Sequence, residues 1–224
     1  MNAHDRIERS RLLYERALFE EDAGALAEAS QELNAVEADL ALARGRLIHG
    51  RFLEWRNENP GRAAEDPREL ALFKRAAQLY GDLGDDRGVA EALFWIGCCH
   101  QVVRQDDTAA VPVLERSLEL ASAAGDEKTM AEALRHLGIA EHKAGRLDAA
   151  RQRLEESTRF RRQLGLQAGV AANLVGLIYI AAGQGRREDA LTLAAQAAAL
   201  AEVSGAHAIL RQVEEASAAV TESQ

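Results

Sequence analysis

Apolar and small residues recur along the second half of the chain with a period of about 40 positions. Glycines mark the breaks before four similar segments: Gly84, Gly125, Gly165 and Gly205. After three of these glycines the chain repeats nearly the same phrase, which reads VAEAL at 89–93, MAEAL at 130–134 and VAANL at 170–174. A fixed period of this length indicates stacked supersecondary units, because each unit is too small to bury its apolar face alone.

Each central unit is expected to be a pair of helices. In the segment 125–163 a first helix carries one stripe of apolar and small residues: Ala131, Leu134, Leu137 and Gly138. Gly145 then ends that helix, and the second helix has an inner side of its own: Leu147, Ala150, Leu154 and Ser157. The same spacing predicts helix pairs in 84–123 and 166–203, and a capping helix at 206–222.

One of these pairs turns without a glycine. In the segment 84–123 the turn is formed by residues 104–107. Thr108 is expected to cap the second helix, because its hydroxyl can accept a hydrogen bond from a free backbone N–H. Pro112 would then fall in the first turn of that helix, where its missing N–H costs little.

The N-terminal third follows the same pattern less closely and is expected to hold two degenerate repeats, 1–42 and 43–83. Their helices are predicted at four places: 5–21, 25–41, 43–57 and 68–82. The second and third of these are either separate or continuous, and Gly45 and Gly50 both compete as the small packing residue of the third. The whole chain is therefore expected to be a single all-α domain of about eleven helices, in five pairs plus a cap.

The two central units carry spacings that resemble the tetratricopeptide repeat. The matching residues are Leu93-x-x-Ile96-Gly97 with Ala110-x-x-x-Leu114, and Leu134-x-x-Leu137-Gly138 with Ala150-x-x-x-Leu154. The longer period is similar to that of bacterial versions, which include helical sensor segments attached to regulators, and Ile178 replaces the small residue in the third unit. The resemblance implies a right-handed α-solenoid whose concave face is lined by the first helix of each pair, with partner binding as the default role.

Composition narrows the classes of function. The net charge of −9 disfavours nucleic-acid binding, which needs a clustered positive surface. The two cysteines, Cys98 and Cys99, are adjacent, so they cannot form an ordinary disulfide on a helix, and this fits a reducing compartment. No run of 18 apolar residues occurs, and no N-terminal apolar stretch follows a basic start. We therefore expect a cytoplasmic protein that neither binds nucleic acid nor spans a membrane.

If the family geometry holds, the first helices expose a mixed polar and apolar set toward a concave groove. That set is Glu91, Phe94, Cys98, Gln101, Glu132, Arg135, Ile139, His142, Val175 and Tyr179. Such a mixture suits an extended peptide with apolar anchors. The leading hypothesis is a non-enzymatic scaffold for a peptide or protein partner, in which Arg135 grips a carboxylate while Phe94 and Tyr179 supply apolar area. The alternative explanation is that several of these side chains only solvate a helix face.

A second hypothesis is an atypical enzyme or small-molecule sensor, in which Glu91, Glu132 and His142 move protons. The loop 57–67 could then act as a lid. The competing interpretation makes the two carboxylates helix formers near helix starts, where negative charge is favoured. No phosphate loop, nucleophile elbow or metalloprotease motif occurs, and we expect no cofactor.

A metal site at Cys98, Cys99 and His100 is not expected, because consecutive helix residues cannot all ligate one ion. A third hypothesis is a homodimer through the N-terminal helices. Their apolar surface exceeds what one partner helix needs: Leu12, Leu13, Tyr14 and Phe19.

Overall fold

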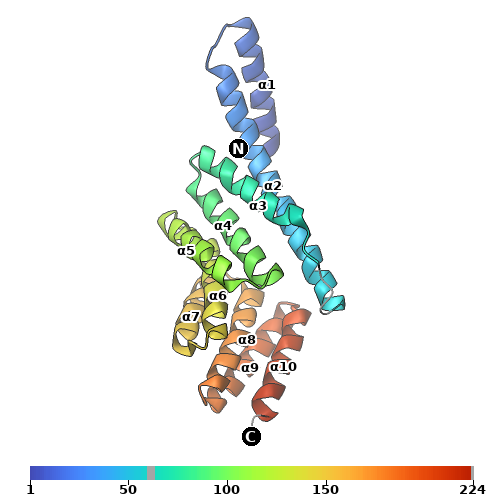
Figure 1. Ribbon diagram of the computed structural model, residues 1–224, viewed down its shortest axis with the longest axis vertical. Coiled ribbons are helices and arrows are strands. Elements are labelled where there is room, and N and C mark those ends of the chain that lie inside the picture. The colour runs from blue at the N-terminus through green and yellow to red at the C-terminus, as the bar shows by residue number, and fades with distance from the viewer. Residues whose placement is uncertain (60–63, 223–224) are drawn as a thin grey trace. The chain divides into compact units, whose positions relative to one another are not determined.

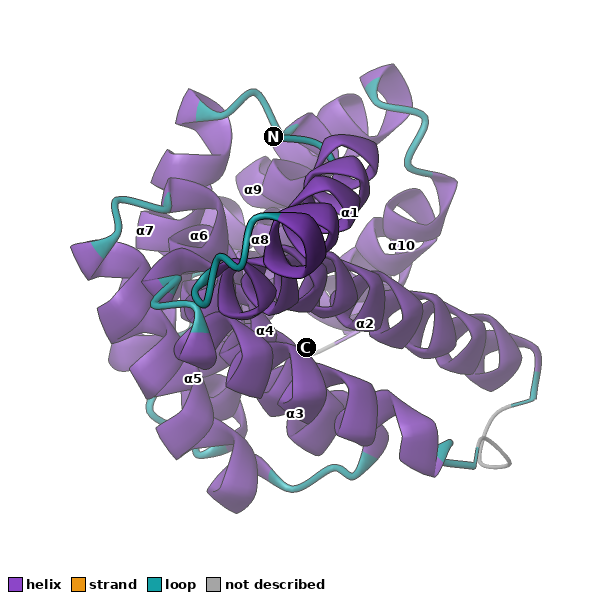
Figure 2. Cartoon of the chain, turned by 90° about the horizontal axis from the view of Figure 1, so that it is seen from above, coloured by secondary structure: helices purple, strands orange, loops and turns teal. Residues whose placement is uncertain are grey.

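The computed structural model describes residues 1–59 and 64–222, and within these ranges it contains α-helices, one π-helical segment and no strand. The helices follow one another along the chain as drawn in Figure 1 and Figure 2. Their bounds are α1 Ala3–Phe19, α2 Ala25–Glu58, α3 Pro67–Asp82, α4 Asp86–Cys98, the π-helix η1 Cys99–Val103, α5 Asp107–Ala123, α6 Glu127–Lys143, α7 Leu147–Gln163, α8 Gln167–Gly183, α9 Arg187–Val203 and α10 His207–Glu222. The predicted all-α helical-repeat fold is confirmed.

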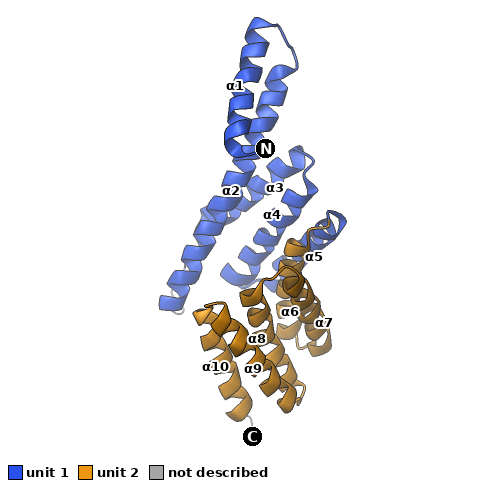
Figure 3. Ribbon diagram, turned by 180° about the vertical axis from the view of Figure 1, so that it is seen from behind, with its two compact units in different colours: residues 1–124 blue, residues 125–224 orange. Residues whose placement is uncertain are grey.

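The chain divides into two compact units, 1–124 and 125–224, which are coloured separately in Figure 3. In the first unit each helix packs on the next, from α1 to α5. In the second unit α6 to α10 do the same, and α8 also contacts α6 and α10. The second unit therefore has two layers, with α6, α8 and α10 in one and α7 and α9 in the other. Among the described residues, no helix is both long enough and apolar enough to cross a bilayer.

The repeat glycines end helices as expected. Gly125 follows α5 with φ of 65°, a left-handed conformation that costs a residue without Cβ little. Among the described residues, five further glycines share this conformation: Gly84, Gly145, Gly165, Gly185 and Gly205. The turn without glycine places Gln105 at φ of 55° instead. Its helix α5 is capped by Asp106, which accepts from the Ala109 N–H at 2.9 Å, so the predicted Thr108 cap is wrong. Pro112 consequently lies inside α5, beyond its first turn.

In the N-terminal third, the structure decides whether the second and third predicted helices are separate or continuous. The predicted helices 25–41 and 43–57 are one continuous helix, α2, of 34 residues. The described residues therefore form ten α-helices rather than eleven. The packing choice between two glycines is settled as well. A Cβ atom on Gly45 would lie 2.4 Å from the Phe73 ring, whereas a Cβ on Gly50 would meet nothing within 4 Å. Gly45 is thus the small packing residue of α2, and it leaves room for the Phe73 ring of α3.

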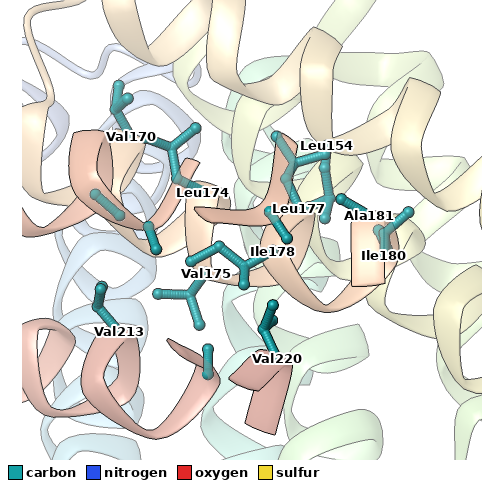
Figure 4. Packing of buried hydrophobic residues seen from close by; sticks show 14 of the residues in the cluster. Leu154, Val170, Leu174, Val175, Leu177, Ile178, Ile180, Ala181, Val213 and Val220 are labelled. Atoms are coloured by element: carbon teal, nitrogen blue, oxygen red, sulfur yellow. The ribbon is translucent and has the colours of Figure 1, made fainter. Parts of the chain in front are cut away.

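The later hairpins repeat this pairing of a small residue on the first helix with a large residue on the second, but in the last hairpin the two sizes are exchanged. Gly97 lies against Leu114, and Gly138 lies against Leu154. In the hairpin of α8 and α9 the large residue is Ile178 and the small one is Ala194, both within one buried cluster. Figure 4 shows Ile178 on the side of α8 that faces Val220 of α10. The large and small residues are thus exchanged relative to the two preceding hairpins, and we expect this exchange to conserve the packed volume.

Buried hydroxyls add a second repeated contact between the helices of a pair. Ser117 Oγ donates to the Ala90 carbonyl at 2.7 Å, and Ser157 Oγ donates to the Ala131 carbonyl at 2.6 Å. Both serines are fully buried, so each hydroxyl needs this acceptor. The repeat therefore fixes polar as well as apolar contacts.

Candidate functional site

The second unit holds six of the side chains predicted for the groove. Four lie on α6 and two on α8, and these helices contact each other. Val175 is buried, whereas Tyr179 is 37% exposed, and Ile139 and His142 are partly exposed. Ile139 directly follows Gly138, and Tyr179 directly follows Ile178, so the two occupy the same repeat position on successive first helices. Unit 2 thus presents Ile139, His142 and Tyr179 on its first helices.

Arg135 is engaged within its own unit. Its Nη1 donates to the Ala172 carbonyl at 2.9 Å and to Asn173 Oδ1 at 3.2 Å, which ties α6 to α8. Asn173 is fully buried and donates in turn to the hydroxyls of Ser157 and Thr158. The guanidinium is therefore part of a polar network that joins α6, α7 and α8.

Glu132 contacts a buried arginine of the second helix in its pair. Its Oε2 lies 2.7 Å from Arg161 Nη2, and Arg161 Nη1 donates to the Gly169 carbonyl at 2.8 Å. Arg161 is only 4% exposed, and burial lowers the pKa of its guanidinium while Glu132 opposes that shift. Glu132 compensates a buried positive charge, which is a structural task.

The first unit holds the other four predicted side chains, on α4 and η1. Glu91 forms an ion pair with Arg46 of α2. Phe94 is 5% exposed and meets Trp95 edge to face at 5.1 Å. Gln101 is 3% exposed, and its amide donates to Asp107 Oδ1 at 2.9 Å, at the start of α5. These side chains are mostly inside the unit.

An acidic residue recurs six positions before each small packing residue of the first helices. Asp39, Glu91 and Glu132 occupy that place relative to Gly45, Gly97 and Gly138. Asp39 accepts from the Tyr80 hydroxyl at 2.7 Å, as Glu91 and Glu132 accept from their arginines. Each of the three carboxylates thus has a partner within its own unit, and the pair proposed for acid–base work lies in two different compact units.

A relay of three polar side chains lies in the interior of the first unit. Cys98 Sγ lies 3.7 Å from His49 Nε2, and His49 Nδ1 lies 2.8 Å from Glu69 Oε1. Their exposed fractions are 3%, 5% and 0%. In the tautomer whose Nδ1–H donates to Glu69, the Nε2 lone pair faces the thiol. This is the order of groups that activates a cysteine nucleophile: thiol, base and orienting carboxylate.

Several buried polar atoms beside this relay have no hydrogen-bond partner among the described residues, namely Glu69 Oε2, Trp95 Nε1 and Arg46 Nε. The His49 ring meets Trp95 edge to face at 5.5 Å, and the Arg46 guanidinium lies 5.6 Å from the Trp95 ring centre. Burial, together with Glu69, raises the pKa of the neighbouring Cys99 thiol to about 12, so Cys99 stays protonated at neutral pH.

Reasoning from the sequence missed His49 and Glu69. The signal lay in the repeat: Glu69 stands four residues before Phe73, at the place held before Leu114 and Leu154 by Ala110 and Ala150. A carboxylate at a position that is otherwise a buried alanine marks a specialised interior.

Two further predictions concern this region. Among the described residues no group of three or more His, Cys, Asp and Glu side chains has an arrangement that could hold a metal ion, and Cys98 contacts His49 of another helix. The predicted lid, 57–67, includes residues 60–63, which lie outside the described residues.

The helix pairs and their small-to-large contacts define the class as a helical-repeat protein. Residues 102–163 match the family model of the tetratricopeptide repeat, so this part of the chain carries tetratricopeptide repeats. Such repeats generally mediate protein–protein interaction and scaffolding. A comparison with curated proteins found no match.

Proposed function

We propose that this chain binds a peptide or protein partner on the first helices of its repeats. In the second unit the contact surface is the part of α6 and α8 that carries Ile139, His142 and Tyr179. The observation that supports this most directly is the pairing of Ile139 and Tyr179 at one repeat position, both accessible while the neighbouring Gly138 and Ile178 are buried. Two apolar anchors beside an imidazole suit an extended peptide.

The other residues predicted for the groove have different roles in this proposal. Glu91, Phe94, Cys98 and Gln101 of the first unit would extend the surface only if a partner displaces their present neighbours. Arg135 holds α6 to α8, so its role is to shape the surface rather than to grip a carboxylate. Two free, buried cysteines support a reducing compartment, and we propose a cytoplasmic location.

Site-specific photocrosslinking tests the surface. A photoreactive phenylalanine analogue is placed at Tyr179, and in a control protein at Leu191 of α9, which is 41% exposed and lies in the other helix layer. After irradiation in lysate of the native host, mass spectrometry should identify a partner at position 179 that is absent at 191. Equal capture at both positions, or full binding of that partner by Tyr179→Ala, contradicts the proposal.

A second candidate function is chemistry or small-molecule sensing at Cys98, and the relay through His49 to Glu69 favours it. In this case His49 Nε2 takes the thiol proton and Cys98 Sγ attacks an electrophile. The original acid–base version, with Glu91, Glu132 and His142, is less well supported because Arg46 and Arg161 occupy the two carboxylates.

Alkylation under native conditions tests this candidate. Iodoacetamide provides a small electrophile from which Sγ displaces iodide, and peptide mass spectrometry follows each cysteine. Cys98 should react faster than Cys99, and His49→Gln should slow Cys98 alone. If both thiols react only when the protein unfolds, the relay is structural.

A further inference from the structure

Helix α2 carries a row of exposed leucines at every seventh position. They are Leu26, Leu33, Leu40 and Leu47, with exposed fractions of 55%, 47%, 46% and 63%. A seven-residue spacing keeps side chains on nearly one face of a helix. Buried residues such as Ala38 and Gly45 lie on another face of α2 and serve its packing within the unit. Buried Ala29 borders the leucines between Leu26 and Leu33, where it packs on Leu13 of α1. The leucines therefore form a second apolar face, which we call the leucine stripe.

The charges of α2 are separated along its length. Residues 25–40 contain four acids and no basic residue: Glu28, Glu32, Glu37 and Asp39. Residues 41–53 contain three arginines and no acid: Arg44, Arg46 and Arg51. Two such helices repel when they align in parallel and attract when they align antiparallel, because opposite halves then meet.

A positively charged surface cavity lies at the basic end of the stripe. It has a volume of about 590 Å³ between α2 and α3. Its lining combines arginines with apolar groups and has no acid: Arg44, Arg51, Arg68, Leu47, Ile48 and Leu72. Arg68 is held by Asp66 at 2.6 Å, whereas Arg44 and Arg51 have no hydrogen bond or ion pair with any described residue. In a protein with net charge −9, this cavity fits an acidic segment with an apolar anchor.

The turn from α1 to α2 has that chemistry. Phe19 is 81% exposed, and it is followed by three acids, Glu20, Glu21 and Asp22. Arg16 forms ion pairs with Glu20 and Asp22, while Glu21 forms no hydrogen bond or ion pair with a described residue. Glu21 also adopts φ of 53°, in this turn at the acidic end of the stripe.

We propose that two copies of this chain pair antiparallel along α2. Leu26 then lies opposite Leu47 of the second copy, and Leu33 lies opposite Leu40. In this register Asp22 lies opposite Arg51, so each α1–α2 turn enters the arginine-lined cavity of the other copy. The two Glu37 carboxylates meet at the centre, where Arg75 Nε donates to Glu37 Oε1 at 2.7 Å and reduces their repulsion.

This surface differs from the seam expected from the sequence. That seam used Leu12, Leu13, Tyr14 and Phe19. Leu13 is 3% exposed and packs on Ala25 and Ala29, so it is not available to a second copy. The proposed seam is also independent of the partner surface on α6 and α8, and either proposal can fail alone.

Charge exchange between two variants tests the pairing. The first variant is Arg44→Glu with Arg51→Glu, and the second is Glu20→Arg with Glu21→Arg. Sedimentation should show the unmodified chain at twice its 24.3 kDa mass, and each variant alone at the monomer mass. Mixing the two variants restores opposite charges at both ends of the seam, so the dimer should return. A monomeric unmodified chain, or variants that dimerise alone, would overturn the proposal.

Cysteine crosslinking fixes the register. Leu26→Cys and Leu47→Cys chains, when mixed and oxidised, should give a disulfide-linked heterodimer, while neither chain crosslinks to itself. Self-crosslinking of Leu26→Cys would show a parallel or different seam. As a folding control, Leu191→Cys on α9 should stay monomeric on oxidised gels, and circular dichroism should show the same helicity for all variants.

Discussion

Gly97 of α4 lies directly against Leu114 of α5, so that a Cβ atom on Gly97 would be 2.6 Å from Leu114 Cγ. The equivalent distance for Gly138 and Leu154 is 3.0 Å. We expect Gly97→Ala to lower the free energy of unfolding by about 1–3 kcal/mol, because the leucine must move in a packed interior. Gly138→Ala should cost less. Chemical denaturation measures both.

Gly50→Ala is the matched control for these substitutions. Gly50 lies in α2 with nothing within 4 Å of the added methyl group, so the change should stabilise the chain by about 0.5–1 kcal/mol through helix propensity. Equal effects of Gly97→Ala and Gly50→Ala would mean that the contact with Leu114 does not limit packing.

Ile178 and Ala194 should be energetically coupled. Ile178→Gly leaves a cavity, and Ala194→Leu overfills the same interior, so each is expected to cost several kcal/mol, on the order of 2–5. The double variant recreates the glycine–leucine arrangement of the two preceding hairpins. Its loss of unfolding free energy should be smaller than the sum of the two single losses by at least about 1 kcal/mol. Strict additivity would contradict a shared volume.

Glu132→Gln and Glu91→Gln should differ in cost although the two carboxylates share a repeat position. Loss of Glu132 leaves Arg161, with 5% of its side chain exposed, as a buried charge without its counterion, and we expect a loss of about 3–5 kcal/mol. Arg46 has 37% of its side chain exposed, so water can replace Glu91 and the loss should be below about 1 kcal/mol. Thermal and urea unfolding of the two variants checks this order. A larger effect at Glu91 would show that Arg46 is more constrained than its exposure indicates.

His100 should make the chain less stable in mild acid. Burial is the main cause that lowers the pKa of its imidazole in the folded state, and the positive charges of Arg104 and Lys74 lower it further. Asp106 and Glu65 partly oppose this shift. The unfolded state therefore binds the proton first, and stability falls as the pH drops below the unfolded pKa of about 6.5. Between about pH 7 and about pH 5, the melting temperature of His100→Gln should fall less than that of the unmodified chain.

The exposed His4 provides a control for this pH dependence. His4→Gln should follow the unmodified chain over the same pH range. If His100→Gln also follows it, another group is responsible for the acid sensitivity.

The repeat made the fold predictable in particular places. Gly138 and Leu154 could be paired from spacing alone, because a small residue and a large one recur at the same two positions in successive hairpins. The continuity of α2 was one of two open choices, since no glycine, proline or cap between 41 and 43 forces a break. The Asp106 cap was missed because Thr108 is also a good capping residue and the turn lacks a glycine.

The candidate site was less predictable than the fold. Contacts such as Arg161 with Glu132 join residues 29 positions apart, and no short motif records them. Cys98 contacts His49 of α2, 49 positions earlier in the chain, and His49 in turn contacts Glu69 of α3. Periodicity identifies which face of a helix is inner, but it does not say which polar side chains are already used by a neighbour. For this reason Arg135, Glu91 and Glu132 seemed available in the sequence and are engaged in the structure.

The continuity of α2 has a consequence for how related chains can vary in length. Because this one helix packs on α1 at its start and on α3 at its end, each added or deleted residue in it would rotate one hairpin about the helix axis by about 100° relative to the other. Evolution can therefore lengthen or shorten α2 most easily by three or four residues, close to whole turns. Homologous chains should show gaps of that size in this segment, and single-residue gaps should gather in the turns instead.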